Sequence, residues 1–336
     1  MTAKRFTSLL VEAGLRPEAQ SGEADVAWVT ADTRTCRACS LFVCMPSRST
    51  DTHALLPAAR AAGAVACLAH SQVGYEGGLA LGMATAWVAS ADFNRSCGAL
   101  ARAVYDDPSA QMRVVGVTGT NGKTTTAWMM RDALRALGRR AGYIGTLGFD
   151  PAGVRRELAN TTPFPVEMWQ LLDEARSLGV EDLVMEASSH ALFERRLFGV
   201  RFSCGVFTNL SQDHLDYHRD MEEYASAKRL LFTEYASVGS GGTPAPQGFV
   251  SAINVGDRVG LVWSRELGAT VSFGAAGADL VVEAVDKRVS SLTLRALFKG
   301  GSEEFRIGVG GQFNVWNATS ALAGLLALGY VLGESC

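Results

Sequence analysis

No stretch of the sequence is apolar over the roughly 18–20 residues that a membrane-spanning helix needs. Residues 1–6 lead into a mixed sequence and not into the apolar core of a secretory signal. The chain also lacks an excess of basic residues, because its net charge is -3, and nucleic acid is therefore not an expected partner. These absences predict a cytoplasmic protein that does not insert into a membrane.

Regularly spaced cysteine pairs are also missing. The 7 cysteines are scattered along the chain, and only Cys36, Cys39 and Cys44 lie close together. No second cysteine or histidine pair follows them at zinc-finger spacing. We therefore expect no metal site at these cysteines, and the pattern favours free thiols in a reducing compartment.

The composition is that of a globular protein with a sizeable core, since 48% of the 336 residues are hydrophobic and 19% are charged. At about 100–200 residues per domain, this length suggests two or three domains. The run Asp-Asp-Pro-Ser at 106–109 interrupts a predicted helix at 92–105 and is typical of a linker. We predict one domain at 1–107 and a second at 108–336, and we find no internal repeat.

Strands and helices are expected to alternate in both domains. In the first, the pattern predicts strands at 26–29, 40–44 and 64–68, with a helix at 51–62. In the second, short apolar runs at 114–117, 183–185 and 205–207 are typical of strands buried on both faces of a parallel sheet. We therefore predict a small α/β domain followed by a doubly wound, mostly parallel α/β domain.

Three further segments of the second domain have a recognisable pattern. Residues 239–248 are rich in Gly and Pro and predict a surface loop. Residues 271–307 contain alternating, strand-like stretches, and a helix is expected from about Asn314 to Leu328.

The most specific feature is the run Gly-Val-Thr-Gly-Thr-Asn-Gly-Lys-Thr-Thr-Thr at 116–126, between the strand at 114–117 and a helix that follows. Glycines let the backbone N–H groups point at one anion, and the start of the helix adds partial positive charge. Lys123 is placed to reach the terminal phosphates of a nucleotide, and the Thr124 hydroxyl to bind magnesium. Gly116 and Gly122 are separated by five residues, one more than in the general phosphate-loop pattern. The alternative is a glycine turn with an exposed lysine.

The part Gly-Thr-Asn-Gly-Lys-Thr-Thr at 119–125 resembles the loop of the Mur ligases, which extend the peptidoglycan precursor one amino acid at a time. Folylpolyglutamate synthetases have a related loop, usually without the paired threonines. The resemblance covers nearly the whole chain. It implies that ATP binds to the residues of this loop: Gly119, Thr120, Asn121, Gly122, Lys123, Thr124 and Thr125.

Several segments are similar to the family's substrate-binding segments. Asn160, Thr161 and Thr162, which precede Pro163, look like a segment that contacts the muramoyl peptide, although locally they are also typical of a turn before a helix near Val166. By the same resemblance Ser188, Glu194 and Arg196 bind substrate, with Glu194 at a position where the family usually has Gln. Thr33, within Asp-Thr-Arg at 32–34, corresponds to the uridine pocket, and of the run Arg-Ser-Thr-Asp at 48–51 only the Asp matches a second nucleotide-binding loop.

Three residues are expected to hold magnesium together with Thr124. Glu186 follows the strand at 183–185, where a carboxylate lies at the mouth of a parallel sheet; the alternative is a carboxylate on the surface. His214 lies in Asp-His-Leu-Asp-Tyr-His, which resembles the family's segment for a second magnesium ion. The pattern around Lys228 alone predicts a solvated helix lysine, whereas the resemblance implies a lysine carbamylated by carbon dioxide. With Lys123, these residues form the expected catalytic set.

Near the end of the chain, Phe-Asn-Val-Trp-Asn-Ala at 313–318 resembles the family's run in which an Asn reads adenine. Asn317 is the first candidate and Asn314 the second, and capping of the helix is the alternative role of Asn314.

The resemblance implies an ATP- and Mg²⁺-dependent monomeric ligase that joins an amino acid to UDP-N-acetylmuramoyl-L-alanyl-D-glutamate through an acyl phosphate. The amino acid is expected to be meso-diaminopimelate, with L-lysine as the alternative. The family's third domain carries an Asp-Asn-Pro-Arg type of motif in the diaminopimelate-adding members, and this sequence has none. We therefore expect the amino-acid-binding domain to be absent, which leaves a non-catalytic nucleotide-binding fragment as the second hypothesis.

Overall fold

The computed structural model describes residues 2–46, 51–89, 93–214, 216–236 and 248–333. Its contacts divide the chain into two compact units. The first comprises Met1–Pro108, Phe164–Asp173 and Arg195–Gly199, and the second comprises the remaining segments. The domain boundary predicted between 107 and 108 stays a prediction.

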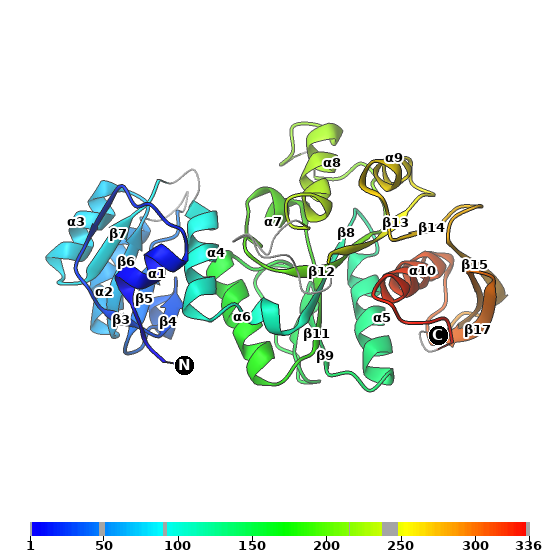
Figure 1. Ribbon diagram of the computed structural model, residues 1–336, viewed down its shortest axis with the longest axis horizontal. Helices are drawn as coiled ribbons and strands as arrows, with labels where there is room; N and C mark the ends of the chain where they lie inside the picture. Colours follow the sequence, from blue (N-terminus) through cyan, green and yellow to red (C-terminus); the bar gives the residue numbers. More distant parts are fainter. Residues whose placement is uncertain (1, 47–50, 90–92, 215, 237–247, 334–336) are drawn as a thin grey trace. The chain divides into compact units, whose positions relative to one another are not determined.

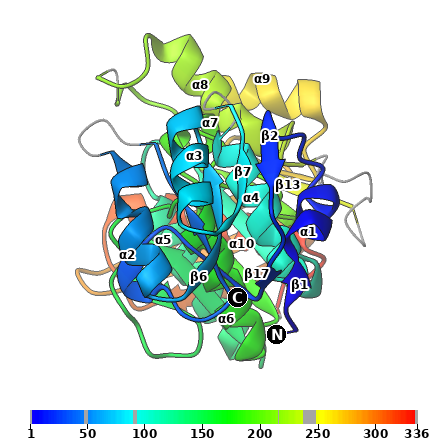
Figure 2. The same cartoon turned by 90° about the vertical axis from the view of Figure 1, so that its left-hand side faces the viewer.

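The first unit contains a mostly parallel sheet with the strand order β2-β7-β6-β5-β4. Its strands are β2 (Ala19–Ser21), β4 (Trp28–Thr30), β5 (Ser40–Val43), β6 (Ala64–Ala69) and β7 (Ala84–Trp87), of which β2 alone runs antiparallel to its neighbour. Helices α2 (Leu56–Ala61) and α3 (Gln72–Ala80) pack on β6 and β7. Helix α4 (Phe93–Val104) lies on the opposite face and contacts α1 (Phe6–Glu12) (Figures 1 and 2).

Two predictions for this unit need correction. The strand predicted at 26–29 is two short strands, because β3 (Asp25–Val26) pairs with β1 (Lys4–Arg5) while β4 joins the main sheet. The described part of the helix predicted at 51–62 begins as a 3-10 turn, Thr52–Leu55, before α2. Pro57 at the start of α2 has no N–H to donate to an α-helical turn before it. Residues 47–50 lie outside the described residues.

The second unit is built on a long sheet with the order β10-β9-β11-β8-β12-β13-β14-β15-β16-β17. Neighbouring strands from β9 to β15 in this order are parallel. Strand β10 pairs antiparallel with β9, β16 with β15, and β17 with β16. The bounds are β8 (Arg113–Thr118), β9 (Ala141–Gly145), β10 (Gly148–Asp150), β11 (Asp182–Glu186), β12 (Phe202–Phe207), β13 (Val250–Asn254), β14 (Val271–Phe273), β15 (Leu280–Lys287), β16 (Leu292–Phe298) and β17 (Gly301–Ile307). The predicted buried strands at 114–117, 183–185 and 205–207 are β8, β11 and β12.

Helices cover both faces of this sheet. Val115 and Val117 of β8 share a core with α5 (Lys123–Ala136) and α10 (Gln312–Ala327). Gly116, between them, faces the other way, toward Leu231 in the 3-10 turn after α8 (Met221–Arg229). On this second face, Trp263 of α9 (Arg258–Leu267) contacts Phe207. The doubly wound, mostly parallel fold is confirmed.

Two further helices, α6 (Pro165–Ser177) and α7 (Ser189–Phe193), lie before and after β11 in the chain. Helix α6 has its first part in one unit and its last part in the other. No helix among the described ranges is both long and apolar enough to cross a membrane. Of the loop predicted at 239–248, only Gly248 is described.

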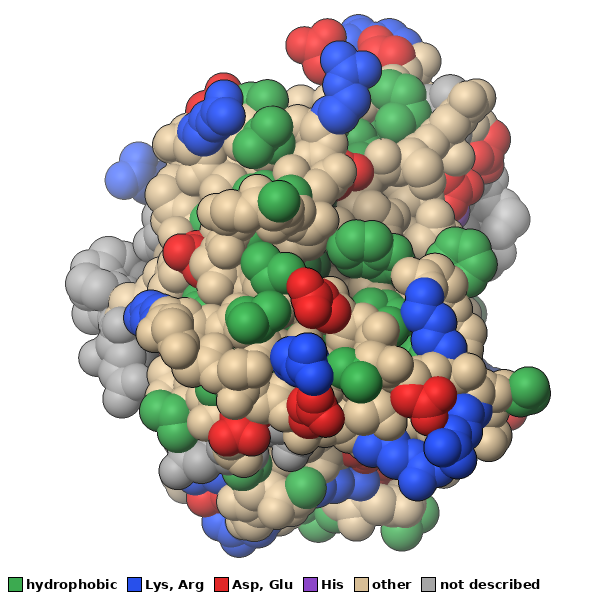
Figure 3. All heavy atoms as spheres, turned by 90° about the vertical axis from the view of Figure 1, so that its right-hand side faces the viewer, with side chains coloured by type: hydrophobic (Ala, Val, Ile, Leu, Met, Phe, Trp, Pro, Cys, Tyr) green, Lys and Arg blue, Asp and Glu red, His purple; other side chains and the backbone are tan. Residues whose placement is uncertain are grey.

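The strand-like pattern at 271–307 corresponds to β14–β17. Strand β17 is the last in the sheet order, and its residues are mostly exposed. Arg295 of β16 pairs with Glu304 of β17 at 2.5 Å. Figure 3 shows acidic, basic and hydrophobic side chains interspersed on this side of the molecule. Charged side chains on an edge strand disfavour pairing with another chain.

Candidate nucleotide-binding site

Three neighbouring parallel strands end at the same edge of the large sheet. Thr118 ends β8, Glu186 ends β11 and Phe207 ends β12. Their following loops therefore meet at the carboxyl edge, where open α/β sheets bind ligands. The loop from Gly119 to Gly122 connects β8 to α5 at this edge.

The glycines of this loop are required by backbone geometry and by space. Gly119 has φ +146° and Gly122 has φ +85°. A Cβ atom on Gly119 would lie 2.0 Å from Thr208 Oγ1, and one on Gly122 would lie 2.3 Å from Asn317 Oδ1. Gly122 precedes the first residue of α5 and brings no side chain to cap the helix. The N–H groups at the start of α5 therefore face the site without a capping side chain, as an anion-binding helix requires.

Asn209 and Thr208, directly after β12, hold the loop in this shape. The Asn209 side chain accepts a hydrogen bond from the Asn121 N–H and donates one to the Asn121 carbonyl, both at 3.0 Å. The Thr208 hydroxyl donates to the same carbonyl at 2.7 Å, and Thr120 N–H donates to the Asn209 carbonyl at 2.8 Å. The loop is thus preorganised by the neighbouring strand.

Two lysines converge on one carbonyl oxygen. Lys123 Nζ donates to the carbonyl oxygens of Gly119 at 3.0 Å and Thr120 at 2.9 Å. Lys228 Nζ, from α8, donates to the same Gly119 oxygen at 2.8 Å. Lys228 is 1% exposed, so its interpretation as a solvated helix lysine is wrong, because α8 packs that face against the loop.

Both lysines are held where a positive charge is unfavourable. Burial lowers the pKa of Lys123, against the opposing charges of Glu186 and Asp213. Burial, followed by the charge of Lys123, lowers the pKa of Lys228 to about 6, although Asp213 opposes this shift. A bound anion such as a polyphosphate would therefore stabilise the charged forms of both lysines.

Glu186 is 1% exposed, so its interpretation as a surface carboxylate is also wrong. Its Oε2 accepts a hydrogen bond from the Thr124 hydroxyl at 2.9 Å. Its Oε1 accepts bonds from the Tyr143 hydroxyl and, at 2.8 Å, from the Thr146 N–H. The Thr124 hydroxyl and the Glu186 carboxylate are hard oxygen ligands in contact, and such a pair suits Mg²⁺.

The predicted substrate segment lies against Glu186. Thr162 donates from its hydroxyl to the Glu186 carbonyl at 2.8 Å, and its Oγ1 lies 3.2 Å from Ser188 Oγ. The Thr161 Oγ1 lies 3.1 Å from Thr146 Oγ1. Asn160 is half-buried in a bend before α6. The structure thus brings Thr161, Thr162 and Ser188 to the same edge as Glu186.

Glu194 and Arg196 each contact an aromatic residue. The Glu194 carboxylate accepts a hydrogen bond from the Tyr217 hydroxyl at 2.8 Å. Arg196 belongs to the first unit, where its guanidinium lies 4.0 Å from the centre of the Phe164 ring. Thr33, also in the first unit, begins a 3-10 turn that Asp32 caps through the N–H of Arg34. Their substrate-binding roles stay predictions.

His214 has a left-handed backbone, with φ +52°. Its Nε2 lies 3.5 Å from Asp213 Oδ2, and its ring centre lies 4.9 Å from that of His190. Among the described residues, no group of three or more His, Cys, Asp or Glu side chains is placed to hold a metal ion. Of the four predicted metal-binding groups, Thr124 and Glu186 are in contact, and a role for His214 stays a prediction.

Asn317 lies beside the phosphate loop, as its closeness to Gly122 shows. Its Nδ2 donates to Asn314 Oδ1 at 3.0 Å. The capping role suggested for Asn314 is wrong, because α10 begins at Gln312 after Gly311 and the Asn314 amide donates to the Gly310 carbonyl at 2.7 Å. Asn317 thus lies next to the loop, and its role in adenine binding stays a prediction.

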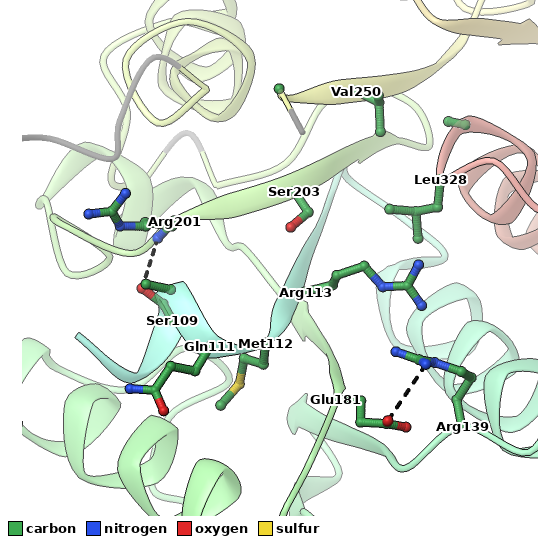
Figure 4. A pocket seen from close by; sticks show the side chains of 13 residues that line it. Ser109, Gln111, Met112, Arg113, Arg139, Glu181, Arg201, Ser203, Val250 and Leu328 are labelled. Atoms are coloured by element: carbon green, nitrogen blue, oxygen red, sulfur yellow. Dashed lines mark hydrogen bonds and ion pairs between the residues drawn. The ribbon is translucent and has the colours of Figure 1, made fainter. Parts of the chain in front are cut away.

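A cavity of about 500 Å³ lies at the opposite, amino-terminal edge of the sheet, around the start of β8 (Figure 4). Arg113 and Arg139 line it, and both pair with the buried carboxylate of Asp182. Arg139 also pairs with Glu181 at 3.6 Å. None of the sequence-predicted site residues lines this cavity, and the carboxyl edge remains the candidate site.

The model of the Mur ligase middle domain matches residues 117–325, which include the phosphate loop, Glu186, both lysines and Asn317. The chain belongs to the Mur ligase family.

Curated Mur ligase relatives resemble the chain beyond this domain. The UDP-N-acetylmuramoyl-L-alanyl-D-glutamate–2,6-diaminopimelate ligase of Coxiella burnetii is 36% identical over 235 residues, 67% of this chain and 46% of that protein. The ligase of the same name from Nostoc is 35% identical over 91% of this chain and 60% of that protein. The chain therefore spans 46% and 60% of the length of these two relatives.

Solved Mur ligase structures share the fold. A UDP-N-acetylmuramoyl-L-alanyl-D-glutamate–2,6-diaminopimelate ligase has a TM-score of 0.77 at 25% identity and covers 100% of this chain and 66% of its own. MurF from Acinetobacter baumannii has a TM-score of 0.71 at 20% identity and covers 100% of this chain and 68% of its own, a likeness that shows the fold alone.

Sequence reasoning missed several functional contacts of this Mur ligase domain. The sequence pattern predicted no role for Thr208 and Asn209, whose side chains hold the loop. Their position, directly after a strand paired with β8, is the signal that could have found them. It also missed Tyr143, because a tyrosine in an apolar strand is typical of a core residue.

Proposed function

We propose that this chain provides the ATP-binding and UDP-substrate-binding parts of a ligase that joins meso-diaminopimelate to UDP-N-acetylmuramoyl-L-alanyl-D-glutamate through an acyl phosphate. The observation that carries this proposal is the phosphate loop with Lys123, set beside the Thr124–Glu186 contact at the carboxyl edge of the sheet. The named relatives are 2,6-diaminopimelate ligases, which favours diaminopimelate over L-lysine. We further propose that the protein works as a monomer in the cytoplasm.

In the proposed reaction, the D-glutamate carboxylate attacks the γ-phosphorus of ATP and the bond to ADP breaks. The amine of diaminopimelate then attacks the acyl carbon, and inorganic phosphate leaves from the tetrahedral intermediate. Several anions must approach one another in the first step. Lys123 and the start of α5 would reduce their repulsion and fix the phosphates in line.

We propose roles for the other residues of the site as well. We propose that Gly119, Thr120, Asn121, Gly122 and Thr125 bind the phosphates and that Asn317 contacts adenine. Thr124 and Glu186 would hold Mg²⁺, which neutralises charge on the phosphates when it is bound. We assign substrate contacts to Asn160, Thr161, Thr162, Ser188, Glu194, Arg196 and Thr33 on the family resemblance.

We also propose that Lys228 is carbamylated and, with His214, holds a second magnesium ion. The amine nitrogen would attack carbon dioxide, form an N–C bond and release a proton to solvent. Burial of Lys228 beside the Lys123 cation supports this, because a carbamate would place a negative charge next to the Lys123 ammonium. A pKa near 6 leaves much of the amine neutral and nucleophilic at neutral pH.

Carbamylation is tested by ¹³C NMR after equilibration with ¹³C-labelled bicarbonate. A carbamate carbonyl signal is expected in the wild-type chain and is expected to be lost in Lys228→Arg. A spectrum without this signal, or a signal that persists in Lys228→Arg, would contradict the assignment to Lys228.

The ligase proposal is tested by phosphate release from ATP in the presence of the UDP-muramoyl dipeptide, with diaminopimelate, with L-lysine and with neither. Release that requires diaminopimelate supports the proposal. The second hypothesis is a nucleotide-binding chain without ligase activity. Tight ATP binding without any amino-acid-dependent release would favour it.

A further inference from the structure

The two oxygens of the Glu186 carboxylate have different hydrogen-bond partners. Oε1 accepts from the Tyr143 hydroxyl and from the Thr146 N–H at 2.8 Å. Oε2 accepts from the Thr124 hydroxyl at 2.9 Å and from the Thr146 hydroxyl at 3.3 Å. The carboxylate is therefore fixed on the Oε1 side by β9 and its following turn, and its Oε2 is directed at the phosphate-loop helix.

The strand register provides the space for the Tyr143–Glu186 contact. Tyr143 of β9 lies opposite Val184 of β11, so its side chain and that of Glu186, two residues further on, project to the same face. A Cβ atom on Gly145 would lie 2.3 Å from both the Tyr143 hydroxyl and Glu186 Oε1. Any residue larger than glycine at 145 would therefore occupy the space of this hydrogen bond.

The Tyr143 ring is held rigidly. Tyr143 is fully buried, and the Trp128 ring lies edge-on to it at 5.1 Å between centres. The guanidinium of Arg131 lies 3.4 Å from the centre of the Trp128 ring and pairs with Asp150 at 2.6 Å. Asp150 is the residue of β10 that lies opposite Tyr143. The phenol is thus enclosed by a buried cation and by two neighbouring strands.

The Tyr143 hydroxyl is the donor in this hydrogen bond, because an ionised carboxylate can only accept. Burial, followed by the charge of Glu186, raises the pKa of the phenol. The protonated phenol donates a hydrogen bond to a carboxylate, and such charge-assisted bonds are strong.

We propose that Tyr143 is a positioning residue for Glu186, whose Oε2 it directs toward Thr124 and toward the Mg²⁺ of a bound nucleotide. The inference rests on the proposed function, since it needs a metal ion at Thr124 and Glu186. Groups that orient metal ligands typically change metal affinity by about 10–100-fold when they are removed.

The test compares wild type, Tyr143→Phe and Tyr235→Phe. ATP binding is measured by calorimetry over a series of Mg²⁺ concentrations and in EDTA. For Tyr143→Phe we expect the Mg²⁺ concentration for half-maximal enhancement to rise about tenfold, with unchanged ATP affinity in EDTA. Tyr235→Phe is the matched control, because Tyr235 is equally buried and its hydroxyl donates to the Leu192 carbonyl. We expect it to keep the wild-type Mg²⁺ dependence.

A purely structural role of Tyr143 would lower ATP affinity in EDTA together with the melting temperature, and this outcome overturns the proposal. So does an unchanged Mg²⁺ requirement. Gly145→Ala is the second variant, because it keeps the phenol and blocks its hydrogen bond to Glu186. We expect the same rise in the Mg²⁺ requirement for this variant. It also serves as the test if Tyr143→Phe cannot be purified. If wild type shows no Mg²⁺-dependent ATP binding, the proposed function fails and this inference fails with it. If wild type shows it and both variants match wild type, this inference alone fails.

Discussion

Lys123 and Lys228 donate hydrogen bonds to one and the same carbonyl oxygen, that of Gly119, from two different helices. Two ammonium groups so close together, with Lys228 almost fully buried, are unfavourable unless an anion joins them. The arrangement links the fold to the proposed chemistry, because triphosphate and a carbamate are both anions that this pair would accommodate.

The first prediction concerns pH. The folded-state pKa of Lys228 is lowered from 10.5 to about 6, so between these values the unfolded chain binds more protons than the folded chain. Stability should therefore rise with pH in this window, by at most about 1.4 kcal/mol per pH unit. Below pH 6 the buried positive charge of Lys228 lowers the unfolding free energy by its full amount, and above pH 10.5 this destabilisation is absent.

Lys228→Met removes this titrating group. From pH 6.5 to pH 8.5 the unfolding free energy of wild type should therefore rise relative to that of Lys228→Met. The measurement is urea unfolding in CO₂-free buffer at several pH values. Lys299→Met is the control, since Lys299 is exposed and its removal should leave the pH dependence unaltered. Parallel curves for wild type and Lys228→Met would show that Lys228 does not titrate in this range.

The second prediction concerns the loop glycines. Gly119→Ala forces a Cβ atom to within 2.0 Å of Thr208 Oγ1 at a backbone angle that L-residues rarely adopt. We expect the unfolding free energy to fall by about 1–3 kcal/mol and ATP affinity to fall at least tenfold. Gly308→Ala is the matched control, because no atom lies within 4 Å of its added Cβ. Equal ATP affinities of the two variants would contradict the loop's role.

Much of this site was predictable, and the reasons differ from residue to residue. The phosphate loop was found because glycine spacing, Lys123 and Thr124 are local in sequence and each has a chemical role. The burial of Lys228 was not predictable, because a helix lysine is ordinarily solvated and the sequence around it gives no sign of the loop that packs on it. Tyr143 was missed because its partner, Glu186, is 43 residues away and the contact depends on the register of β9 and β11.

The fold shows the same division. Apolar runs identified β8, β11 and β12, since strands buried on both faces leave a clear pattern. The single strand expected at 26–29 proved to be two, because pairing of β3 with β1 is a long-range choice that alternation does not encode. Pro57, by contrast, was a local signal that should have moved the start of α2.

The third prediction concerns base recognition. Asn317 lies against Gly122 of the loop, and a side-chain amide can both donate to and accept from the adenine edge. Asn317→Leu should lower the ratio of ATP to GTP affinity about tenfold, by the loss of one or two hydrogen bonds. Competition binding with the two nucleotides measures this ratio. A ratio that stays at the wild-type value would remove Asn317 from the adenine site.

The fourth prediction concerns Lys123 itself. Lys123→Ala should weaken ATP binding by at least tenfold, because the proposed phosphate site would lose a cation that lies against the loop. Calorimetric titration with MgATP gives the affinity, and Lys287→Ala serves as the control, since the Lys287 ammonium donates to the exposed Gln312. ATP binding in Lys123→Ala at wild-type strength would refute the phosphate-loop assignment.

The central claim, that this sheet edge transfers phosphate from ATP to a substrate carboxylate, is tested most directly by trapping the acyl phosphate with hydroxylamine. Hydroxylamine replaces the amino acid as the attacking amine, so the trap does not depend on an amino-acid pocket. We predict a hydroxamate of the UDP-muramoyl dipeptide that forms only with ATP and Mg²⁺ and is absent in Glu186→Gln. Binding of both substrates without any hydroxamate would contradict the account.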